Sequence, residues 1–195
     1  MKLIRNILAI IGVIAVAAAI WAAPKLYAYK SAFDSFDGKA FATYKSMFDR
    51  LMKTGSPAAA TVWRTKVADG VSFDDVVQSI KTIAEERNIK SVGALPLGDQ
   101  VGAMEGKPWR KLNIYLYCNP LTAKKMVEFD PAYAAYLPCR VSLVEDENKQ
   151  LWIYTLDMDM MIHGGKPLPP ALLKEALHVK DIMQDILKRA AAGDF

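Results

Sequence analysis

Two cysteines supply the most reactive side chains of this chain. Cys118 lies at the end of one expected strand, and Cys139 lies at the start of the next. If these strands are antiparallel neighbours, both residues lie at one edge of the sheet, where a disulfide with a Cα separation of roughly 4.4–6.8 Å is feasible. The sequence leaves open a structural disulfide, two buried free thiols, and a thiol redox or metal site. Arg140 favours the last alternative, because a nearby positive charge lowers a thiol pKa.

A methionine-rich run, residues 155–167, supplies a second set of soft ligands. The residues proposed as metal ligands there are Met158, Met160, Met161 and His163. Thioether sulfur and imidazole suit copper, a metal that exported proteins meet. On a strand, Met158 and Met160 would share one face, and Met161 and His163 would share the other. The competing interpretation is that the methionines fill an irregular gap in the core and that His163 lies in a loop.

No catalytic residue is assigned from the sequence, and we expect a protein that is not an enzyme. Neither cysteine stands in a local nucleophile motif with His163 or His178, and His178 is expected beside the apolar stripe of the last helix. The chain has two histidines and no CxxC motif, so its cysteine spacing fits no zinc pattern. The carboxylates at 145–147 fall in an expected hairpin turn, where solvation is the simpler explanation.

An apolar segment near the N-terminus predicts attachment to a membrane. Ile7 to Ala23 carries no charge and follows Lys2 and Arg5. Its length approaches the about 20 residues of a membrane span and exceeds the roughly 7–15 apolar residues of a cleavable signal. The alternative is a signal peptide, for which small residues at 17 and 19 offer a cleavage site. Both interpretations export the remaining chain, and the basic N-terminus favours a cytoplasmic start.

The charge distribution argues against nucleic acid as a partner. The formal net charge of the 195 residues is +4, and acidic and basic residues are mixed along the chain without a basic stripe. We therefore expect the cytoplasmic membrane, with the C-terminal domain on its periplasmic side, as the location.

Composition and periodicity divide the chain into three parts. These are a transmembrane anchor or uncleaved signal (1–23), a connector with an amphipathic helix (24–57) and a globular domain with a C-terminal helix (58–195). Pro24 is expected to end the membrane helix. The domain should contain strands at 61–67, 90–95 and 112–118, a hairpin at 139–157, helices at 73–88, 121–129 and 168–192, and a mobile loop at 96–110.

Two local motifs mark helix starts within the domain. Ser72 and Asp75 form a candidate capping box, and Asn119-Pro120 ends a strand and offers a cap for the following helix. An apolar stripe is expected along the last helix, formed by Leu172, Ala176, Val179, Met183, Ile186 and Ala190.

Residues 61–157 resemble the family of domains of unknown function numbered 302. The resemblance is carried by the strand and helix at 61–88, the strand ending in Cys118-Asn119-Pro120, the short helix, the corner at 137–140 and the hairpin. It implies an α+β fold with a mainly antiparallel sheet and packed helices, usually in a dimer, and no established catalysis. The membrane segment, the helix before Thr61 and the long last helix are additions to that pattern.

These observations predict a membrane-anchored, exported binding or accessory module, attached through residues 7–23 and working with a protein partner or as a homodimer. The alternative is a protein that handles copper, haem or thiol redox chemistry through the two cysteines and the methionine and histidine run. The sequence identifies neither the cofactor nor the ligand.

Overall fold

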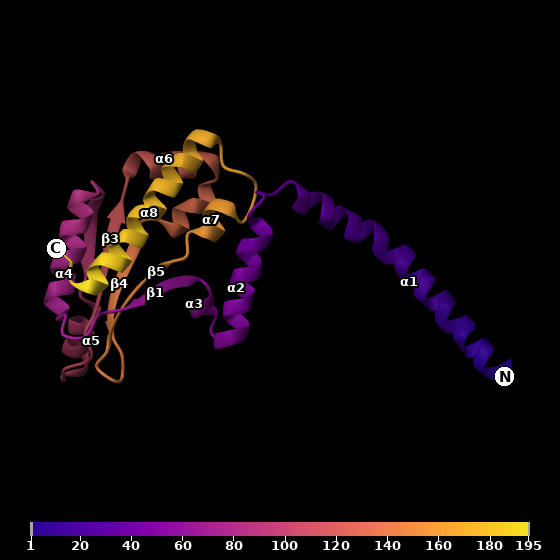
Figure 1. The fold of residues 1–195 in the computed structure, drawn as a ribbon, viewed down its shortest axis with the longest axis horizontal. Helices are drawn as coiled ribbons and strands as arrows, with labels where there is room; N and C mark the ends of the chain where they lie inside the picture. The colour runs from indigo at the N-terminus through magenta and orange to yellow at the C-terminus, as the bar shows by residue number, and fades with distance from the viewer. Residues whose placement is uncertain (1, 195) are drawn as a thin grey trace.

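Five strands form one antiparallel sheet, and burial alternates along its three central strands. They are β1 (Val62–Lys66), β2 (Lys90–Leu95), β3 (Leu112–Cys118), β4 (Cys139–Glu145) and β5 (Leu151–Leu156), in the order β1-β5-β4-β3-β2. Every neighbouring pair is antiparallel. The computed structural model describes residues 2–194 and confirms an α+β domain behind a long N-terminal helix (Figure 1).

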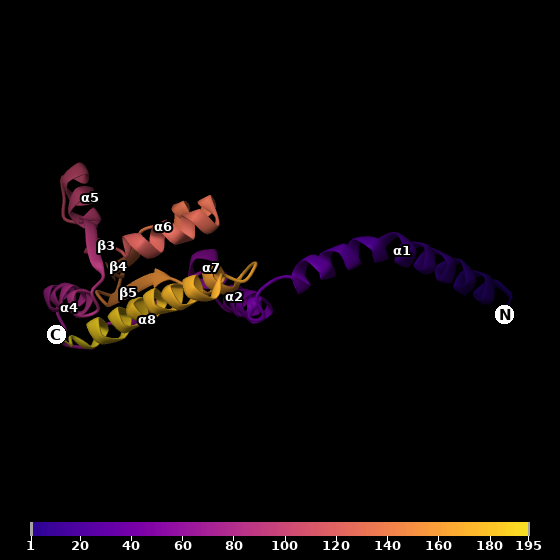
Figure 2. The same ribbon diagram turned by 90° about the horizontal axis from the view of Figure 1, so that it is seen from above.

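Two helices cover one face of this sheet and complete the core. α4 (Phe73–Glu86) and α8 (Pro170–Ala192) pack against each other on the same side of the strands (Figure 2). Their buried stripes meet side chains that alternate along the central strands, including Tyr117, Val141, Leu143 and Ile153. The stripe predicted for the last helix is confirmed, since all six of its residues are buried.

Both predicted helix caps are present. The Ser72 hydroxyl accepts the N–H of Asp75, and the Asp75 carboxylate accepts the N–H of Ser72. The Asn119 side chain accepts the N–H groups of Leu121 and Thr122 at the start of α6 (Pro120–Phe129). These bonds satisfy amide groups that have no partner within their own helix.

The N-terminal helix is longer than expected. α1 (Lys2–Asp34) continues through Pro24, so the predicted break there was wrong. A proline removes one helical hydrogen bond and bends the helix, but the flanking turns keep their own hydrogen bonds and the helix continues. The helix is arched rather than straight in Figure 2, as a proline within a helix leads us to expect. It is exposed, long and apolar enough to cross a membrane, which is consistent with either a signal or an anchor.

A short connector joins α1 to the domain. α2 (Ala40–Thr54) is followed by Gly55 in the left-handed conformation, and α3 (Pro57–Ala60) leads into β1. The Arg50 guanidinium binds the carbonyl of Ala60 and lies 2.5 Å from the Asp157 carboxylate, which is largely buried. This ion pair fastens α2 to the end of β5.

The segment predicted as a mobile loop contains a helix instead. α5 (Leu97–Glu105) lies against β3, with Gly98 at the closest approach. A Cβ atom on Gly98 would lie 2.6 Å from the Arg110 carbonyl oxygen. The glycines that indicated a loop therefore allow a helix to contact strand backbone closely.

Candidate functional site

The two cysteines lie beside one small apolar cavity at the edge of the sheet where β3 ends and β4 begins. Its volume is about 50 Å³. Its walls come from α6, the 3₁₀ helix η1 (Pro131–Tyr136), α7 (Asp159–His163) and α8. Five sulfur-containing residues are among those that line it: Cys118, Cys139, Met126, Met158 and Met161. We call this the sulfur-lined cavity.

The sheet register explains how the cysteines meet. β3 and β4 are antiparallel neighbours in which Tyr117 pairs with Cys139, so Cys118 lies one residue beyond that pair. The sequence analysis predicted that both thiols lie at one sheet edge if these two strands are antiparallel neighbours, and the structure meets that condition. Both are free thiols in the structure.

Burial keeps these thiols protonated near neutral pH. It raises the pKa of the Cys139 thiol to about 11, and nearby Cys118 contributes to that increase. A backbone hydrogen bond and the charge of Arg140 act in the opposite direction but do not overcome burial. Burial also raises the pKa of the Cys118 thiol. Arg140 was predicted to lower the pKa of the Cys139 thiol, but the effect of burial is larger and the pKa is raised.

The methionine run is helical rather than extended, which changes the faces that its members share. The Asp157 carboxylate accepts the N–H of Asp159 and turns the chain into α7. Met158 and Met161, three residues apart, consequently both line the sulfur-lined cavity. The Tyr133 hydroxyl donates to the Met161 carbonyl oxygen at 2.8 Å and holds α7 over η1.

A second cavity adjoins the first on the side of α2. It has a volume of about 250 Å³, and Tyr136 and Met161 line both cavities. Met160 and Met47 line the second cavity only. Met160 is thus separated from the other two methionines of its run.

The histidines lie apart from these sulfur atoms. His163 is buried, lines neither cavity and places Nδ1 3.2 Å from Oδ1 of Asp37, without hydrogen-bond geometry. The adjacent Gly164 and Gly165 carbonyls accept the Tyr44 hydroxyl and the Asp37 N–H. His163 therefore stands where the connector after α1 meets α7. His178 is exposed on α8.

The remaining predicted site residues have structural positions. Asn119 lines the cavity while it caps α6, and Pro120 occupies the first turn of that helix. Arg140 pairs with Leu116 across β3 and β4. Met126 was missed by the sequence interpretation, because its helical pattern resembles that of any core methionine. Within residues 2–194, no group of three or more His, Cys, Asp or Glu side chains is placed to hold a metal ion.

The fold and the cavity together define a class of protein: an α+β domain with an antiparallel sheet, helices on one face and a small apolar site at one sheet edge. The chain belongs to the DUF302 family, described as a domain of unknown function, whose model matches residues 63–190. It is similar to an uncharacterized protein of Aquifex aeolicus, at 21% identity over 126 residues that cover 64% of this chain and 81% of the relative.

A solved structure supports the fold. The chain resembles the crystal structure of an uncharacterized conserved DUF302 protein from Bacillus stearothermophilus, with a TM-score of 0.52 and 16% identity. The match covers 67% of this chain and 98% of the other. The predicted family is therefore confirmed. Its model extends to residue 190, so α8 belongs to the family domain, and the prediction that the last helix is an addition to the pattern was wrong.

Proposed function

We propose that this chain is a membrane-tethered binding module that holds a small ligand in the sulfur-lined cavity on the periplasmic side of the cytoplasmic membrane. The observation that carries the proposal is the cavity itself. Thiols and thioethers from four separate parts of the chain surround it, and its walls are almost entirely apolar. Small ligand sites are typically preformed apolar hollows with a few placed polar groups, here Asn119 and Thr122.

Aromatic side chains at the end of the apolar segment and just beyond it support a tether over a cleaved signal. Trp21, Tyr27 and Tyr29 are 68%, 75% and 75% exposed on α1. Cleavage near residue 19 would leave these rings in water. In an anchored chain they lie at the membrane interface, where Trp and Tyr are favoured.

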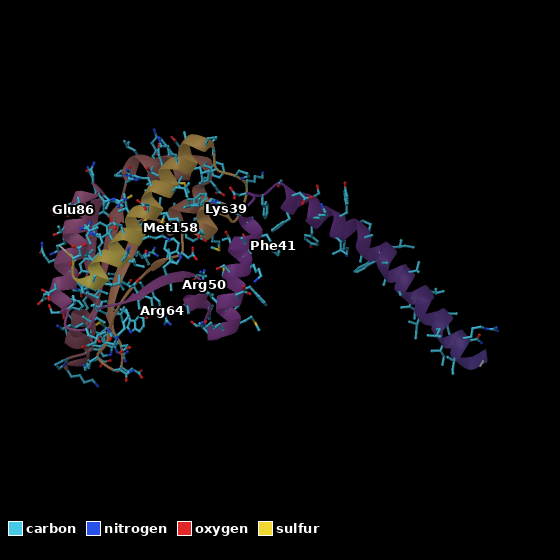
Figure 3. The ribbon with its side chains drawn as sticks, viewed as in Figure 1. Lys39, Phe41, Arg50, Arg64, Glu86 and Met158 are labelled. Carbon is cyan, nitrogen blue, oxygen red and sulfur yellow. The ribbon has the colours of Figure 1, made fainter. Side chains whose placement is uncertain are left out.

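The outer side of α2 supports the same arrangement. Phe41, Phe48 and Met52 form an exposed stripe, with Arg50 on the opposite side facing the domain (Figure 3). α2 begins shortly after α1 ends, so this stripe stays close to the bilayer. Aromatic side chains next to lysines are typical of helices that lie at a membrane surface.

The test is extraction of the full-length protein from its own membrane in mild detergent, followed by native mass spectrometry and a search for co-purifying chains. We expect a bound small ligand, with or without a protein partner or second copy. Ala123→Leu, which fills the cavity from α6, should abolish the ligand adduct. Ala171→Leu, on an exposed position of α8, should retain it. A ligand-free wild-type monomer or homodimer would contradict the proposal.

Thiol redox chemistry is the second candidate, because the two cysteines lie at adjoining strand ends beside the same cavity. The thiolate is the reactive form in such chemistry, and the raised pKa values oppose it.

We therefore expect iodoacetamide to label the folded protein slowly at pH 7.5 and increasingly fast as the pH approaches 11. The reason is that labelling follows the thiolate fraction, which increases only as the raised pKa values are approached. Mass spectrometry of the labelled protein, with unfolded protein as the control, measures the rate. Fast labelling at neutral pH, or a Cys118–Cys139 disulfide in protein purified without reductant, would favour the redox function.

A further inference from the structure

Sulfur-containing residues are concentrated around the two adjoining cavities. Both cysteines and five of the nine methionines line them: Cys118, Cys139, Met126, Met158 and Met161 around the first, with Met47 and Met160 added around the second. Leucine and isoleucine fill a core as well as methionine and specify it better. Thioethers grouped around two thiols therefore indicate a ligand that prefers sulfur.

We infer that the sulfur-lined cavity binds one Cu(I) ion through a cysteine thiolate and the thioethers of Met126, Met158 and Met161. This inference rests on the proposed function, since it names the ligand of the same cavity. Soft thiolate and thioether ligands select Cu(I), whereas Zn²⁺ prefers thiolate, imidazole and carboxylate.

The charge of the cavity favours a monovalent ion. Among the described residues, its lining contains no carboxylate and no cationic side chain. When Cu⁺ replaces the proton of one thiol, that proton leaves to solvent and the cavity stays neutral. An uncompensated charge in such an apolar site would be costly.

The size of the cavity favours a bare ion. A volume of about 50 Å³ accommodates a metal ion within reach of several side chains, whereas a haem macrocycle is many times larger. The surroundings also hold the ligands in place. Tyr133 fixes α7 through the Met161 carbonyl, and Asn119 fixes the start of α6, which carries Met126. Such supporting bonds orient metal ligands.

The test is an anaerobic titration of the full-length protein in mild detergent with Cu(I), using bicinchoninate as a coloured competitor. We expect wild-type protein to remove about one Cu(I) per chain and to release about one proton. Met158→Leu with Met161→Leu, and separately Cys118→Ser with Cys139→Ser, should weaken binding by at least roughly 10- to 100-fold. Circular dichroism confirms that each variant is folded.

Met160→Leu is the matched control, because Met160 belongs to the same run but lines only the adjoining cavity. It should bind Cu(I) as wild type does, as should Met104→Leu at a surface position that is 88% exposed. Equal losses in Met160→Leu and in Met158→Leu/Met161→Leu, or no uptake by wild type, would overturn the inference. If wild type ignores Cu(I) but carries an organic adduct that Ala123→Leu removes, the proposed function stands and only copper is rejected.

Discussion

Arginine at both Ile10 and Ile14 should abolish stable insertion of this protein into the membrane. Both residues lie within the apolar run of α1 and are 60% and 63% exposed. Each arginine at the centre of a span costs about 2.5–3.5 kcal/mol. Because about 1.4 kcal/mol corresponds to a tenfold change in an equilibrium constant, two arginines should lower the inserted fraction by several powers of ten. Fractionation with a carbonate wash measures the outcome. Wild type should remain in the membrane pellet, and the double variant should not.

Ser31→Arg is the control, because Ser31 lies on the same helix beyond the apolar run. It should leave the protein in the membrane fraction. The intact mass of the wild-type protein separates an anchor from a signal. Full-length mass in the washed pellet supports the tether, and a periplasmic product lacking about the first 19 residues would contradict it.

Leu143→Ala should cause a large loss of stability. Leu143 is fully buried at the centre of β4, among the side chains that meet α4 and α8. Truncating a buried leucine costs about 2–5 kcal/mol, because it removes packing and leaves a cavity. At about 2–4 °C per kcal/mol for a domain of this size, the melting temperature should decrease by roughly 10 °C. Thermal unfolding followed by circular dichroism measures it.

Leu177→Ala is the matched control on α8. Leu177 is 37% exposed and lies outside the buried stripe of that helix. Leu177→Ala should lower the free energy of unfolding by less than half as much as Leu143→Ala does. If both variants lose equal stability, the assignment of the inward face of α8 is wrong.

Sequence patterns were sufficient where a structure depends on neighbours along the chain. The Ser72 and Asp75 caps, the Asn119 cap and the stripe of α8 all involve residues within a few turns of each other. The ranges predicted as strands and as the hairpin also contain all five strands. The order of these elements was enough to indicate the family.

Local sequence patterns gave wrong predictions where contacts between distant segments determine the secondary structure. The glycines of α5 indicated a loop because their partner, the backbone around Arg110 and Leu112, is not visible in the local pattern. Pro24 indicated a break because proline disfavours a helix interior, but α1 continues through it. The shared faces considered for the methionine run assumed a strand, because nothing in the run shows that Asp157 turns the chain while it binds Arg50.

The sequence by itself determined an α+β domain of the DUF302 family behind an apolar helix, and it singled out candidate soft ligands at Cys118, Cys139 and in the methionine run. Only the tertiary structure decided which of those ligands share a cavity. It brought Met126 in, moved Met160 to the neighbouring cavity and placed His163 against Asp37. The physical reason is that helical or extended geometry sets the direction of each side chain, and packing between distant segments sets which directions converge.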